Sequence, residues 1–162
     1  SIVITSTTVV LAYIVSSFRS SNKINSNEVV RQNGNSAISQ FSRMIQFADS
    51  FSGANTVDND ATYTSPCPQT GGTYNYIKLR YQGQDRKLSC NTDGIKIDGG
   101  SIIDTQRVSV AAGTCSFTCS QAGSSVPPVI GINFELSLGD STSAPEKSAN
   151  IKFSTTVKMR NL

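Results

Sequence analysis

The chain opens with an uncharged, hydrophobic run. Residues 1–18 are rich in Ile, Val, Leu and Thr, and no proline or glycine occurs before Gly34. As a helix this run would be roughly 27 Å long, slightly less than the hydrocarbon core of a bilayer. It has no basic n-region, no small-residue cleavage site and no initial Met, so it does not fit a signal peptide. We therefore expect an apolar helix that inserts into a membrane or a protein assembly, rather than a core helix of a globular domain.

A single apolar stripe continues through the polar segment that follows. Its members recur at spacings of three, four or seven residues, which is typical of one buried helix face. The stripe consists of Val30, Ala37, Ile38, Phe41, Ile45 and Ala48. We predict one long helix from Ser1 to about Phe51. A glycine lowers helix stability by about 1 kcal/mol relative to Ala, so a bend or local melting is expected at Gly34.

The hydrophobic period changes from 3.6 to 2 after a predicted loop over residues 52–73. A hairpin is expected over residues 74–90, and shorter strands over 95–97, 107–110 and 115–119. The clearest alternation lies in residues 130–138 and 151–159. This pattern predicts an antiparallel sheet with one wet face and one covered face.

The predicted fold class is α+β. A long N-terminal helix (residues 1–51, apolar to about residue 18) packs on a C-terminal antiparallel sheet within a β head (residues 74–162). The contact between helix and sheet is expected to involve Ile38, Phe41, Ile45, Ile132, Phe134, Leu136, Phe153 and Val157.

The amino-acid composition limits the kinds of binding and catalysis that the chain can carry out. The 14 basic and 11 acidic residues give a net charge of +3 and are scattered, so no nucleic-acid patch is evident. His and Trp are absent, which removes the usual general base and the usual metal ligand. We expect no enzyme activity, no cofactor, no metal site and no small-molecule substrate.

Four cysteines, Cys67, Cys90, Cys115 and Cys119, lie in the second half of the chain. Without His their spacing fits zinc poorly, so we predict two disulfides and a compartment outside the cytoplasm. In a strand, Cys115 and Cys119 would be about 13 Å apart, too far for a direct bond. This favours bonds from each of them to Cys67 or Cys90. The alternative, with Cys67 bonded to Cys90 and Cys115 to Cys119, requires a tight turn at residues 116–118.

Two polar clusters suggest ligand sites, and each has an ordinary structural explanation. Residues 91–94 with Asp98 resemble a calcium loop, but the Glu of an EF-hand is missing, and an Asx-rich turn explains them better. The second cluster combines aromatic and basic side chains, as DNA-stacking surfaces do. Tyr and Lys also alternate in ordinary antiparallel strands, so the cluster alone does not support DNA binding. It consists of Tyr74, Tyr76, Tyr81, Lys78, Arg80 and Arg86.

The order of elements resembles the type IV pilin superfamily: an apolar helix continuing into an amphipathic one, a loop, and terminal antiparallel strands. Residues 126–132 (Val-Pro-Pro-Val-Ile-Gly-Ile) and the closing residues 153–161 look like the endings of pilin-like proteins, including minor pseudopilins of type II secretion. Mature pilins usually begin with an aromatic or methylated residue and carry an acid at the fifth position, where this chain has Ser1 and Thr5. This difference favours a chain that lacks its leading residues.

The resemblance implies a structural subunit of an extracellular type IV pilus-like filament on a prokaryotic cell surface. Its partners would be copies of itself or homologous pilins, with the cell membrane as its location before assembly. Packing in the filament core is then expected for Ile2, Val3, Ile4, Val9, Val10, Leu11, Ile14, Val15 and Phe18. Alternatives are a minor pseudopilin of a type II secretion system and a membrane-tethered monomeric surface binding module. The Ser and Thr residues of the apolar run favour closely packed helices over a lone lipid-facing span.

Overall fold

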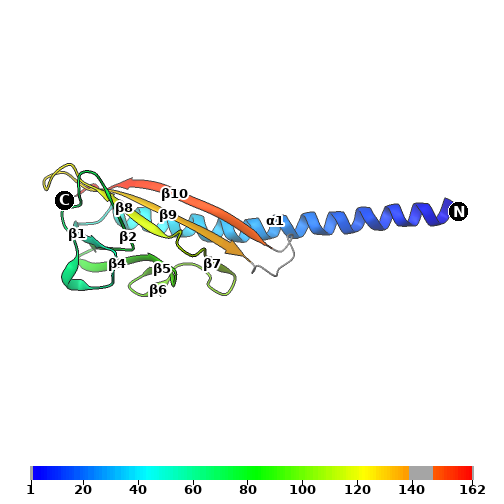
Figure 1. The fold of residues 1–162 in the computed structure, drawn as a ribbon, viewed down its shortest axis with the longest axis horizontal. Coiled ribbons are helices and arrows are strands. Elements are labelled where there is room, and N and C mark those ends of the chain that lie inside the picture. The colour runs from blue at the N-terminus through cyan, green and yellow to red at the C-terminus, as the bar shows by residue number, and fades with distance from the viewer. Residues whose placement is uncertain (1, 139–147, 162) are drawn as a thin grey trace.

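A computed structural model describes residues 2–138 and 148–161; for residues 2–15, 18, 19 and 22 it describes the backbone alone. Helix α1 (Ile2–Gln46) runs without interruption through Gly34, and its N-terminal part extends away from a β-rich head (Figure 1). Among the described side chains, the first buried one is Ser26. Residues 23–46 contact the head, and Lys23 Nζ donates to the backbone oxygen of Ser148 at 2.6 Å.

The head contains two antiparallel sheets. The first has the strand order β1-β3-β4-β5-β6 and the second the order β10-β9-β8-β2, with β7 also paired to β9. The strands of the first sheet are β1 (Ser50–Asn55), β3 (Tyr76–Tyr81), β4 (Gln84–Asn91), β5 (Gly94–Ile97) and β6 (Gly100–Ser101). Those of the second are β2 (Gly72–Tyr74), β7 (Val108–Val110), β8 (Ser116–Ser120), β9 (Val129–Leu138) and β10 (Ala149–Lys158). A short 3-10 helix covers Asp60–Thr62.

The predicted fold class is therefore wrong in its central feature, because the long helix does not pack along its length on a single sheet. Among the described side chains of α1, those that contact the head belong to residues 23–46, and the strands divide between two sheets. The predicted helix end near Phe51 is also wrong, since α1 ends at Gln46 and β1 begins at Ser50. Backbone pairing with β3 holds this polar segment extended, with a bulge between Phe51 and Gly53. Local periodicity does not reveal such long-range pairing.

Gly34 is a contact position and not a bend. The ring of Phe153 lies directly over it, and a Cβ at position 34 would overlap that ring. The missing side chain allows the helix backbone to approach β10 closely. Phe153 in turn stacks on Phe134, with ring centroids 5.2 Å apart.

One hydrophobic core joins the helix to both sheets. Phe41 is fully buried and its ring lies 5.4 Å from that of Phe117 on β8. Ile38 and Val157 are only partly buried and pack at the core margin. The other members of the predicted contact are all buried: Phe41, Ile45, Ile132, Phe134, Leu136 and Phe153.

Two disulfides cross-link the head. Cys67 bonds to Cys119, and Cys90 on β4 bonds to Cys115, just before β8. These are long-range pairings of the kind that the strand geometry favours, and the local alternative is wrong. The Cys90–Cys115 bond joins the two sheets, and Asn75 Nδ2 donates to the backbone oxygens of both cysteines, at 2.9 and 3.3 Å.

Candidate functional site

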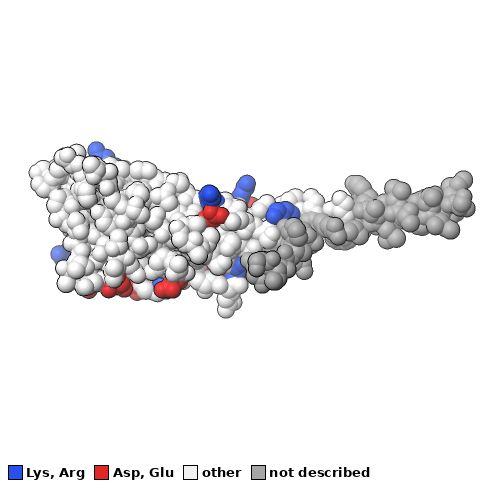
Figure 2. Space-filling view, in the orientation of Figure 1, with Lys and Arg blue, Asp and Glu red and all other residues white. Residues whose placement is uncertain are grey.

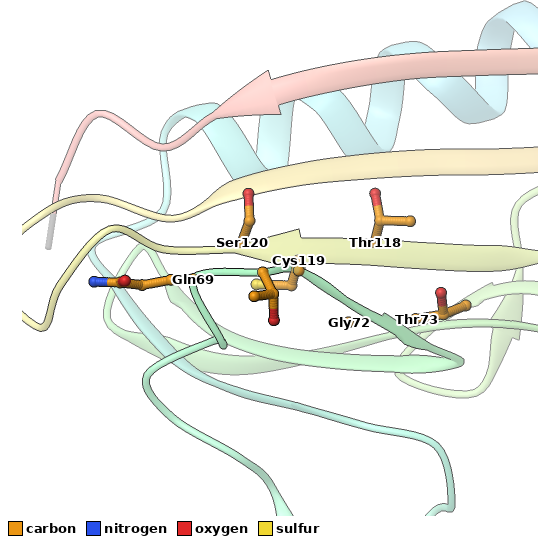
Figure 3. Close-up of a pocket in the computed structure, with 8 residues that line it drawn as sticks. Gln69, Gly72, Thr73, Thr118, Cys119 and Ser120 are labelled. Atoms are coloured by element: carbon orange, nitrogen blue, oxygen red, sulfur yellow. The ribbon is translucent and has the colours of Figure 1, made fainter.

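A groove of about 500 Å³ lies where β2 pairs with β8 (Figure 3). Its volume falls within the range of pockets that hold small ligands. Its lining comes from the loop before β2, from β2 itself and from the end of β8. The lining residues are Gln69, Thr70, Gly71, Gly72, Thr73, Thr118, Cys119 and Ser120.

The local sequence explains how β2 reaches this register. The backbone N–H of Gly71 donates to Pro68 O at 3.1 Å, and Gly71 has a φ of 82°. Glycine adopts this left-handed conformation without the steric cost that a Cβ imposes. The turn places Gly72 opposite Cys119 and Thr73 opposite Thr118. Because side chains alternate along paired strands, the two threonines lie on the same face.

The loop that forms one wall of the groove is fixed to β8 and to the next loop. Cys67 is bonded to Cys119, and the Cys67 N–H donates to the buried Gln121 Oε1 at 3.1 Å. Gln121 Nε2 donates to Val126 O at 2.8 Å. Gln69 Nε2 donates to Ala122 O at 2.7 Å. These bonds hold the wall in place before any ligand arrives.

The lining of the groove is uncharged, and the nearby Lys158 lines an adjacent pocket that shares Gln69 and Ser120 with it. Thr118 pairs with Gly131, which pairs with Thr156, so one row of small residues crosses β2, β8, β9 and β10. A Cβ at Gly131 would overlap the Thr118 hydroxyl, which therefore lies over the glycine. Most of the visible face of the head carries no charged residue in Figure 2.

The lining defines what the groove can do chemically. None of the eight lining residues carries a charge, and the side-chain polar groups are hydroxyls and one amide. Hydroxyls both donate and accept hydrogen bonds, whereas an anion would need Lys, Arg or convergent N–H groups. No general base is present to activate a nucleophile. The arrangement is suited to hydrogen-bonded recognition of a neutral molecule.

The calcium-like loop has the geometry of a turn. Asn91 Oδ1 accepts a bond of 3.0 Å from the Asp93 N–H, which is an Asx turn. The Asp98 carboxylate accepts bonds from Arg86 Nη1 at 2.6 Å and from the Lys87 N–H at 2.8 Å. Within residues 2–138 and 148–161, no group of three or more His, Cys, Asp or Glu side chains is placed to hold a metal ion.

Two basic side chains of the Tyr, Lys and Arg cluster, Lys78 and Arg86, pair with acids. Lys78 Nζ lies 3.6 Å from Asp60 Oδ1 and 6.0 Å from the ring centroid of Tyr63. Arg86 pairs with Asp98 at 2.6 Å. Burial, followed by the nearby charges of Asp58 and Asp60, raises the pKa of Tyr63 to about 12. These ion pairs leave less positive charge for a phosphate backbone.

One set of predicted site residues lies outside the described side chains, and the groove is a feature that the sequence does not predict. The nine side chains predicted to pack in a filament core lie outside the described part of the structure. The sequence does not predict the groove, because its pattern predicts a loop over residues 52–73 and β2 is only three residues long. One signal was present: Thr118 and Ser120 alternate with Phe117 and Cys119, which indicates an outward-facing polar side of β8.

Comparison of the chain with protein-family models, curated proteins and solved structures gives no match. In the part of the chain that the structure describes, no helix combines the length and the apolar character needed to cross a membrane.

Proposed function

We propose that the chain is a structural subunit of an extracellular filament of the type IV pilus kind, assembled through α1 and exposing the β head. The observation that carries this proposal is the division of the helix. Residues 23–46 lie on the head, while the N-terminal part extends beyond it (Figure 1). The extending part includes the hydrophobic run of residues 1–18. Hydrophobic side chains outside the head gain free energy when other copies of the helix cover them.

Ile24 supports the same proposal from within the described side chains. It lies on α1 close to where the helix leaves the head, and 65% of its surface is exposed. A large apolar side chain at this place is suited to contact with a neighbouring helix. The two disulfides support an oxidising location outside the cytoplasm.

Electron microscopy of sheared cell-surface material tests the proposal directly. Cells that produce the full chain should carry thin filaments containing it, and deletion of residues 1–18 should leave a monomeric head without filaments. A head that still polymerises after this deletion would exclude assembly through the helix. A full chain found only as a membrane-bound monomer would favour the tethered binding module instead.

A point variant gives a finer test. Ile24→Glu places a charge at the exposed apolar position and should abolish filaments while the thermal unfolding of the head stays unchanged. The matched control is Ser39→Glu, an exposed position of α1 alongside the head. Normal filaments with Ile24→Glu would mean that this part of the helix makes no contact between subunits.

A further inference from the structure

We infer that the groove between β2 and β8 binds a neutral carbohydrate. This inference goes beyond the proposed filament function and does not depend on it, because all eight lining residues belong to the head. It rests on the volume of the groove, its lining chemistry and the fixation of its wall.

The lining matches the groups that a sugar presents. Thr70, Thr73, Thr118 and Ser120 each contribute a hydroxyl, and Gln69 contributes an amide oxygen. Each sugar hydroxyl needs partners that donate and partners that accept, and a side-chain hydroxyl can do either. The side-chain hydroxyls can therefore supply both donors and acceptors to a sugar without any charged group.

Backbone exposure adds to this match. Gly71 lines the groove without a side chain and has room beside it, so a ligand can approach its main chain closely. The corresponding space beside Gly72 is filled by the ring of Tyr74. Small-molecule sites commonly use backbone N–H and C=O groups to orient the ligand. Thr73 and Thr118 sit across from each other on the same face, and both line the groove.

The composition of the groove argues against other ligand classes. Phosphates and nucleic acids need positive charge, and none of the eight lining residues is Lys or Arg. An apolar ligand would leave the hydroxyls and the amide without partners, which is costly. An extended peptide would need a longer free strand edge, whereas β2 has three residues.

The wall is also rigid enough to select a ligand. The Cys67–Cys119 bond and the hydrogen bond from Gln69 Nε2 to Ala122 O fix the loop before binding. Preorganisation lowers the entropy cost of binding and so partly offsets the openness of a surface groove.

The test uses the full chain in mild detergent on an array of neutral and anionic glycans, followed by NMR titration with methyl glycosides of the sugars that bind. Neutral glycans should bind, and the backbone amide signals of Gly71, Gly72 and Thr118 should shift. Thr73→Val and Thr118→Val should each weaken binding about five-fold, the equivalent of about one hydrogen bond. Thr73→Ser, which keeps the hydroxyl, should restore binding.

Thr156→Val is the matched control, because Thr156 is an exposed threonine on the same row but does not line the groove. It should bind as the unmodified chain does, and thermal unfolding should show that all variants remain folded. The inference is overturned if no neutral glycan binds, if only anionic glycans bind, or if Thr156→Val weakens binding as much as Thr118→Val. Amide shifts caused by extended peptides and not by sugars would identify a strand-docking edge and would also overturn it.

Discussion

Glycine at position 34 allows a close contact between α1 and Phe153 and does not mark a flexible point of the helix. The Phe153 ring occupies the space in which a Cβ at position 34 would lie. Helix propensity alone predicts that Gly34→Ala stabilises the chain by about 1 kcal/mol. The overlap predicts the opposite sign, since inserting a methyl group into a packed contact costs about 1 to 3 kcal/mol.

Chemical denaturation of Gly34→Ala measures which effect is larger. We expect a lower free energy of unfolding, whereas Ser39→Ala at an exposed helical position should leave it nearly unchanged. Phe153→Leu in the Gly34→Ala background should recover part of the loss, because a smaller side chain relieves the overlap. A stabilised Gly34→Ala variant would show that Phe153 moves aside freely.

Ionisation of Tyr63 makes the free energy of unfolding depend on pH in the alkaline range. Its hydroxyl is buried and has no hydrogen-bond partner among the described residues, and its pKa is raised from 10.0 to about 12. In the unfolded chain the phenol ionises as the pH passes 10.0, whereas in the folded chain it stays neutral until about pH 12. The stabilisation is therefore fully present below pH 10 and is lost as the pH rises from 10 to 12.

Urea unfolding at a series of pH values tests this linkage. Tyr63→Phe should make the alkaline loss of stability shallower and should cost nothing at neutral pH, because the removed hydroxyl has no partner. Tyr76→Phe is a contrast, since the Tyr76 hydroxyl accepts a 2.9 Å bond from Asn91 Nδ2. Its loss should cost about 1 kcal/mol at neutral pH. An unchanged alkaline slope in Tyr63→Phe would exclude Tyr63 as the group responsible.

The two disulfides should contribute similar free energies of stabilisation, but they connect different elements. Their bonded residues are separated by 52 and 25 positions, so the loss of either bond should cost about 3 to 4 kcal/mol through the unfolded state. Of the two disulfides, Cys67–Cys119 is the one that fixes the wall of the groove.

The double variant Cys67→Ala/Cys119→Ala should therefore lose the groove as well as stability. In NMR spectra the amide signals of Gly71 and Thr73 should broaden or move toward unstructured values. Cys90→Ala/Cys115→Ala should lose a similar stability while these signals stay in place. Equal effects of the two double variants on Gly71 and Thr73 would mean that the bond to β8 does not order this loop.

Helix α1 and the second sheet depend on each other through aromatic side chains. Phe41 lies against Phe117, and Phe134 stacks on Phe153. Phe41→Ala and Phe134→Ala should each lower the free energy of unfolding by about 3 to 5 kcal/mol. Phe47→Ala is the control, because Phe47 is 46% exposed beside Arg160. Equal thermal stability of Phe134→Ala and Phe47→Ala would contradict the core placement.

The arrangement of the whole chain connects both proposals. The proposed assembly segment lies at the N-terminal end of the long helix, and the strands β2 and β8, which line the groove, lie in the head (Figure 1). A filament would then present many copies of a weak carbohydrate site. Multiple copies raise the effective concentration of sites and give avidity without any new contact.

The sequence predicts those features that depend on local periodicity. The stripe containing Phe41 and Ile45 identifies a buried helix face, and the alternation around Ile132 and Phe134 identifies a covered strand face. The spacing of Cys115 and Cys119 favours long-range bonds, since strand geometry separates them. In each case the side-chain pattern repeats with the period of the element that carries it.

Tertiary structure alone decides what depends on pairing between distant segments. The polar residues 50–55 become a strand because β3 offers backbone partners, and three residues at 72–74 become β2 because β8 does. The groove arises from that second pairing, and the close contact at Gly34 is made with the ring of Phe153, more than a hundred positions away. Hydrophobic periodicity encodes which side of an element is buried, whereas partner and register are fixed by packing and hydrogen bonds across the folded chain.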